Sequence, residues 1–115
     1  MKSALLAICM FFASAANADC GANEPFERLL KSKQHTVTGP FTVEELERNN
    51  QIEIRKTGET LPFGYANEGW KNLKQAKRPG DEIFYVVFRD GRFGMAQHIL
   101  VQEGCVTFWL LDWIT

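Results

Sequence analysis

The chain has 115 residues, 45% of them hydrophobic, with 13 basic against 14 acidic side chains. Such a balanced charge gives no indication of a nucleic acid or an anionic membrane surface as a partner. The length suits one compact domain and excludes a multi-domain assembly of ordinary domain size.

The N-terminal segment has the pattern of a cleavable secretion signal. Lys2 provides a positive start, residues 4–12 form an uninterrupted apolar run, and a small-residue triplet, Ala-Asn-Ala, ends at Ala18. Signal peptidase accepts small side chains at the outer positions of such a triplet, so we expect cleavage between Ala18 and Asp19. The apolar run is shorter than the roughly 20 residues that span a bilayer, which disfavours an anchor. The sequence therefore predicts a signal over 1–18 and an exported, periplasmic or secreted domain over 19–115 without a membrane span.

Loss of the signal changes both the charge and the cysteine count. It removes Lys2 and Cys9, which leaves 12 basic against 14 acidic groups, a net charge of −2, and two cysteines. Exported compartments favour oxidation, so a disulfide between Cys20 and Cys105 is expected. It would close a loop of about 85 residues, for which the chain-entropy model gives about 4–4.5 kcal/mol of stabilisation. Because there is no C-x-x-C and no histidine at ligand spacing from a cysteine, neither a metal nor a cofactor is expected.

The first half of the expected domain contains signals for helices and for one strand. Residues 25–33 place apolar side chains at helical spacing after a proline, which predicts a short helix. Thr42 and Glu45 form a capping box that begins a second helix, expected to end near Asn50. Residues 51–56 alternate polar and apolar side chains, as a half-buried strand does.

A third helix and a three-stranded meander are expected after that strand. Asn67 is expected to cap a helix that runs to about Lys77, with Pro79-Gly80 stopping it. The β-rich runs that follow are separated by the turn sequences Asp90-Gly91 and Glu103-Gly104, which predicts a meander. Its first and third runs are apolar at both odd and even positions, so both faces of the sheet should be at least partly covered.

Together these elements predict an α+β fold. The expected architecture is a small antiparallel sheet, made of the C-terminal meander and one earlier strand, packed with two to three short helices.

No set of catalytic side chains stands out in the sequence. There is no G-x-S-x-G motif, and the acidic residues of the second helix are expected on a solvated face. His98 lies within a predicted strand, where a histidine in the core or at its rim is the favoured interpretation. Asp112 lies in an apolar strand and must be paired, exposed at an edge or functional, with edge exposure favoured.

Two groups of side chains are candidates for a binding surface. Trp109 and Trp113 share strand parity and would stand on one face, as core residues or as part of an open aromatic patch. The second candidate is a basic helix face, which is more often simply solvated. Its residues are Lys71, Lys74, Lys77 and Arg78.

The leading functional hypothesis is a non-enzymatic binding module that acts through a protein–protein surface. The partner would be another protein of the envelope or the medium, as for an inhibitor, an immunity protein or an envelope accessory protein. The alternatives are a small cell-wall or glycan-processing hydrolase that uses Asp112, His98 or a glutamate, and a glycan-binding module with coplanar exposed aromatics. The hydrolase predicts a pocket in which two titratable groups converge with perturbed pKa values.

Overall fold

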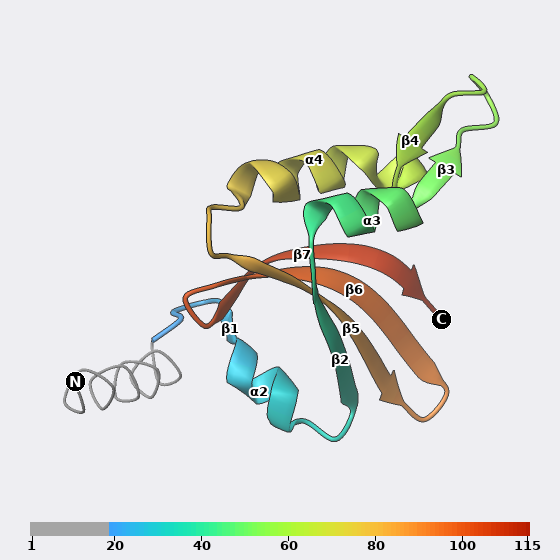
Figure 1. Ribbon diagram of the computed structural model, residues 1–115. Coiled ribbons are helices and arrows are strands. Elements are labelled where there is room, and N and C mark those ends of the chain that lie inside the picture. The colour runs from blue at the N-terminus through green and yellow to red at the C-terminus, as the bar shows by residue number, and fades with distance from the viewer. Residues whose placement is uncertain (1–18) are drawn as a thin grey trace.

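A computed structural model describes residues 19–115 of the chain. The predicted signal segment and its last residue, Ala18, lie outside the described residues. The fold is α+β, as the sequence predicts, with a curled antiparallel sheet and short helices on its two faces (Figure 1).

The main sheet has five strands in the order β1-β7-β6-β5-β2, and every neighbouring pair is antiparallel. Its strands are β1 (Glu24–Pro25), β2 (His35–Phe41), β5 (Glu82–Asp90), β6 (Phe93–Gln102) and β7 (Cys105–Ile114). A separate two-stranded sheet contains β3 (Gln51–Glu53) and β4 (Thr60–Pro62). The helices are α2 (Phe26–Lys31), α3 (Val43–Asn49), α4 (Asn67–Ala76) and the 3₁₀ turn η1 (Gly64–Ala66).

The C-terminal meander is confirmed, with the second turn at the predicted residues and the first shifted by one residue, to Gly91-Arg92. Asp90 pairs with Phe93, so the first connection is a two-residue turn that starts at Gly91. The second is Glu103-Gly104, where both residues have positive φ, 52° and 82°. Two successive positive φ values match the twist of the strands that they join, which explains why this sequence forms a tight hairpin.

The strand that pairs with the first strand of the meander is β2, and not the predicted strand over 51–56. It pairs with β5 from His35 to Phe41, with an irregularity between Thr38 and Phe41. Gly39 and Pro40 interrupt its alternation, so the segment carries a weak local strand signal and depends on its pairing with β5. The predicted strand over 51–56 is shorter than expected and belongs to the separate sheet, which projects away from the main body (Figure 1).

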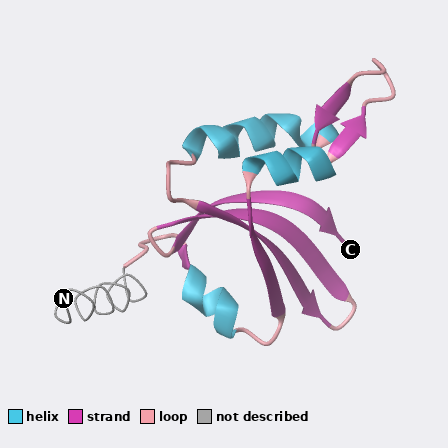
Figure 2. Cartoon of the chain, viewed as in Figure 1, coloured by secondary structure: helices cyan, strands magenta, loops and turns pink. Residues whose placement is uncertain are grey.

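Helices cover the main sheet on both faces, which explains why its strands are apolar at both parities. Figure 2 shows α3 and α4 on one face and α2 on the other; we call these the α3/α4 face and the α2 face. The core of the α3/α4 face consists of Leu46, Phe63, Trp70, Leu73, Ile83, Leu100 and Leu110. The core of the α2 face consists of Leu29, Phe84, Val86, Ile99, Val101 and Val106.

Local side-chain contacts fix the helices on the α3/α4 face. Thr42 and Glu45 form the predicted capping box at the start of α3. Asn67 does not cap α4: it is the first residue of that helix, and its amide donates instead to the carbonyl of Pro62. The buried indole of Trp70 donates to Glu47, which ties α4 to α3 over 2.8 Å.

The predicted disulfide is present. It joins Cys20, close to β1, to Cys105, the first residue of β7, and encloses 85 positions of the chain. Among residues 19–115, no helix is long and apolar enough to cross a membrane.

Candidate functional site

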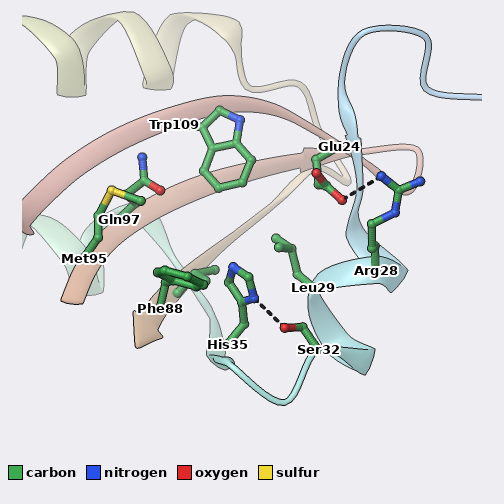
Figure 3. A pocket seen from close by; sticks show the side chains of 10 residues that line it. Glu24, Arg28, Leu29, Ser32, His35, Phe88, Met95, Gln97 and Trp109 are labelled. Carbon is green, nitrogen blue, oxygen red and sulfur yellow. Dashed lines mark hydrogen bonds and ion pairs between the residues drawn. The ribbon is translucent and has the colours of Figure 1, made fainter. Parts of the chain in front are cut away.

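A hollow lies on the α2 face, between α2 and the curled sheet. Its volume is about 540 Å³, within the range of ligand sites in proteins. Figure 3 shows the indole of Trp109 on one side of this hollow, with Phe88 and His35 opposite. We call it the Trp109 groove; its apolar lining consists of Leu29, Val86, Phe88, Met95 and Trp109.

Strand pairing explains why residues from three strands meet in the Trp109 groove. Paired residues of antiparallel strands point to the same face of a sheet. Val86 pairs with Gln97 and Phe88 pairs with Met95, so four lining side chains of β5 and β6 share the α2 face. Trp109 joins them because it pairs with Ile99 of the α2-face core.

Polar groups stand at the rim of the groove. Arg28 and Glu24 form an ion pair of 3.4 Å, and the Nδ1 of His35 lies 2.7 Å from the hydroxyl of Ser32. The imidazole of His35 also packs against Phe88, with ring centroids 4.9 Å apart. An apolar floor with a few oriented polar groups is the usual composition of a binding site.

Trp109 and Trp113 do not share a face, contrary to the prediction from their parity. Gln97 pairs with Leu111 while Ala96 pairs with Trp113, so Asp112 is an extra residue in β7. A bulge of this kind shifts the alternation of the strand that contains it. As a result, Trp109 and Trp113 lie on opposite faces and do not form one aromatic platform.

Trp113 packs on the α3/α4 face instead of lining the groove. The guanidinium of Arg89 lies 5.0 Å from the centroid of its ring. A Cβ on Gly94 would come within 3.1 Å of the same ring, which shows how closely the indole covers this backbone. Trp113 is therefore a half-buried packing residue, whereas Trp109 is 40% exposed.

The exposed apolar surface continues from Trp109 along β7. Leu111 and Ile114 are 48% and 55% exposed. They pair with Gln97 and Met95, both of which line the groove, so all three β7 side chains lie on the α2 face. We call this row, Trp109, Leu111 and Ile114, the β7 stripe.

The four predicted cations do not form one helix face. Helix α4 ends at Ala76, and Lys77 already has an extended backbone, which places Lys77 and Arg78 beyond the helix. Lys74 is paired with Glu47 at 2.6 Å, and Arg78 with Asp81 at 3.5 Å. Lys71 is exposed on α4.

The carboxylate of Glu47 accepts hydrogen bonds from two donors, and these bonds affect its pKa. Hydrogen bonds from Lys74 and Trp70 lower the pKa of the Glu47 carboxyl, although partial burial opposes them. The prediction of a solvated helix face is wrong for this acid, which instead joins α3 to α4. Of the two lysines of α4, Lys74 is therefore engaged in an ion pair within the fold, whereas Lys71 is exposed.

His98 and Asp112, the residues of the hydrolase alternative, lie on the α3/α4 face. His98 is only 4% exposed and packs between Phe63 and Tyr85, with ring centroids 5.1 and 4.7 Å away. Asp112 is exposed and accepts a hydrogen bond of 2.6 Å from the hydroxyl of Tyr85. Burial, then the hydrogen bond to Asp112 and the negative charge of that carboxylate, raise the pKa of Tyr85 to about 12. Tyr85 is therefore a neutral donor at physiological pH.

His98 is held neutral by its surroundings. Burial lowers its pKa, and the nearby charge of Asp112 only partly offsets that effect. Its Nδ1 is buried and has no hydrogen-bond partner among the described residues. Protonation would therefore place a charge at a buried position.

The stability of the fold should accordingly fall as the pH drops below the ordinary pKa of histidine. Because the folded-state pKa of His98 is lowered, the unfolded chain binds its proton first, at about pH 6.5, and stability is lost below that pH. We expect the free energy of unfolding to decrease between pH 7.5 and 5.5, as measured by urea denaturation in a His35→Gln background. His98→Leu in the same background should remove this decrease, and an equal decrease in both proteins would contradict the assignment.

The comparisons with known proteins find no similar protein. No protein-family model matches the chain, no curated protein matches its sequence, and no solved structure matches its fold significantly.

Most of the groove was not identified from the sequence. The turn at Gly91-Arg92 contains the information that Val86, Phe88, Met95 and Gln97 share a face, because it sets the register of β5 and β6. The position of α2 over that face depends on tertiary packing and has no local signal.

Proposed function

We propose that the chain is an exported, non-enzymatic protein-binding module that takes up an apolar side chain of a partner protein in the Trp109 groove. The observation that supports this most is the groove itself, a hollow of about 540 Å³ with an apolar floor and a tryptophan 40% exposed at its side. Tryptophan is among the residue types that most often dominate the binding energy at protein interfaces.

The surroundings of the groove favour a protein over a small solute as the partner. The β7 stripe extends the apolar surface beyond the hollow, and contiguous exposed apolar surface of this kind marks interaction sites. The rim contains the Glu24–Arg28 ion pair and the His35–Ser32 contact. An apolar centre with a polar rim is the usual anatomy of a protein interface.

Export is part of the proposal, and two features support it. The N-terminal sequence has the signal pattern, and the Cys20–Cys105 disulfide suits an oxidising compartment. In the periplasm or the medium, the module would serve as an inhibitor, an immunity protein or an accessory factor of an envelope complex.

The test compares variants of the oxidised domain, residues 19–115, as bait for proteins of a periplasmic extract. Trp109→Ala removes the indole, and Met95→Glu places a charge in the floor of the groove. Tyr65→Ala is the matched control, because Tyr65 is an aromatic residue 76% exposed outside the groove. We expect a protein that is captured by the wild type and by Tyr65→Ala to be lost with both groove variants, by at least about tenfold in affinity, the usual effect of an interface hot spot.

Two results would overturn the proposal. One is a captured partner whose affinity is unchanged by Trp109→Ala and by Met95→Glu, since binding would then use another surface. The other is the absence of any specific partner in extracts prepared from cells that express the protein.

A further inference from the structure

A second hollow, of about 240 Å³, lies on the α3/α4 face, opposite to the Trp109 groove. It is formed where the end of α3 meets β5, β6 and β7. Phe41 and Leu46 provide apolar walls, and Asn50, Tyr85, His98 and Asp112 provide polar groups. We call it the Asp112 cavity.

We propose that the Asp112 cavity binds a primary ammonium group on an alkyl chain, the group that a lysine side chain and a free alkylamine share. This inference is independent of the proposed function, because it concerns the other face of the sheet. It rests on the charge, the acceptors and the shape of the cavity.

The cavity contains one uncompensated negative charge. Asp112 is exposed, and its hydrogen bond comes from a neutral phenol, the hydroxyl of Tyr85. Among residues 19–115, the ion pairs within 4.0 Å involve other carboxylates, so no lysine or arginine neutralises Asp112. A cation from outside the fold would complement this charge.

The buried imidazole of His98 belongs to the same cavity. It lines the cavity while being 4% exposed, and its Nδ1 lacks a partner in the part of the chain that the structure describes. Buried polar atoms without a partner are rare in proteins and are a reason to look for a functional role. Burial keeps His98 neutral by lowering its pKa, so the imidazole does not supply the missing positive charge itself.

Asn50 adds an acceptor and the apolar walls add space for a carbon chain. The side-chain amide nitrogen of Asn50 donates to the carbonyl of Leu46 over 2.7 Å, which leaves the amide oxygen as an acceptor. Long cationic side chains bury their methylene groups against apolar surface while the charge remains hydrated or paired. Phe41 and Leu46 offer such a surface.

The arrangement suits an ammonium better than a guanidinium. Tyr85 already donates to Oδ2 of Asp112, so the two carboxylate oxygens are not equally open to a ligand. A guanidinium binds a carboxylate most strongly when two parallel N–H groups contact both oxygens. An ammonium is a compact charge whose three N–H donors do not lie in one plane, so it can bind one oxygen and other acceptors at the same time.

The test is a nuclear magnetic resonance titration of the oxidised 19–115 domain with n-butylammonium. We expect saturable shifts of the signals of Tyr85, His98 and Asp112, and weaker binding at high salt. 1-Butanol is the neutral probe of equal length and n-butylguanidinium the planar cation; both should bind more weakly. A peptide with one lysine distinguishes the sources: equal binding assigns the site to a partner's lysine, and weaker binding assigns it to a free amine.

Asp112→Asn keeps the shape of the side chain and removes its charge. It should weaken n-butylammonium binding about fivefold, the upper end of what one exposed ion pair contributes. Asp90→Asn is the matched control, because Asp90 is an exposed acid at the end of β5 that does not line this cavity. The proposal is overturned if 1-butanol or n-butylguanidinium binds as tightly as n-butylammonium, if Asp112→Asn binds like the wild type, or if no shift saturates.

Discussion

Replacing both Cys20 and Cys105 by alanine is expected to lower the free energy of unfolding by about 4 kcal/mol. The disulfide encloses 85 positions, and the entropy that it removes from the unfolded chain grows with the length of that loop. An unfolding free energy of about 5–15 kcal/mol is usual for domains, so this is a large share of the total. The bridge also lies where β1 joins β7, and β1 has only two residues paired to that strand.

Urea unfolding of the oxidised wild type and of the double variant measures this effect. Chemical reduction of the wild type is the matched control, because it opens the same loop without changing a side chain. The reduced wild type and the double variant should agree within about 1 kcal/mol. A loss below about 1 kcal/mol in both would show that the loop-closure argument does not hold for this chain.

Trp70→Ala is expected to cost about 3–5 kcal/mol, the usual loss for a large aromatic residue in a core. Trp70 is completely buried and stacks on Phe63 with ring centroids 4.6 Å apart. The substitution also removes a donor from Glu47, which lies between α3 and α4. Two helices therefore lose a shared contact through one side chain.

The free energy of unfolding of Trp70→Ala should be compared with that of Trp109→Ala. Trp109 is 40% exposed, and its replacement should change the free energy of unfolding by less than about 1 kcal/mol. The comparison separates the tryptophan that supports the fold from the one that we propose binds a partner. If Trp109→Ala destabilised the domain as much as Trp70→Ala, the groove would have to be interpreted as part of the core.

The parts of the fold that sequence analysis predicted are those with a local cause. Thr42 and Glu45 satisfy each other's backbone groups within one turn, and the Glu103-Gly104 turn depends on two adjacent residues. The disulfide followed from there being two cysteines in the expected mature domain. In each case the required information lies within a few residues or in a simple count.

The parts that were missed depend on contacts between distant segments. β2 contains Gly39-Pro40 and forms a strand because it pairs with β5. The faces of Trp109 and Trp113 were assigned from regular alternation, which the extra residue Asp112 interrupts. Strand parity predicts a face only as far as the next bulge.

The position of Asp112 also affects how the two proposed sites relate to each other. The residues of the β7 stripe and the pair Asp112 and Trp113 alternate along a single strand, so β7 supplies side chains to both surfaces. The two ligands would lie back to back, separated by one layer of backbone. Any displacement of β7 that accommodates one ligand would therefore also move side chains that contact the other.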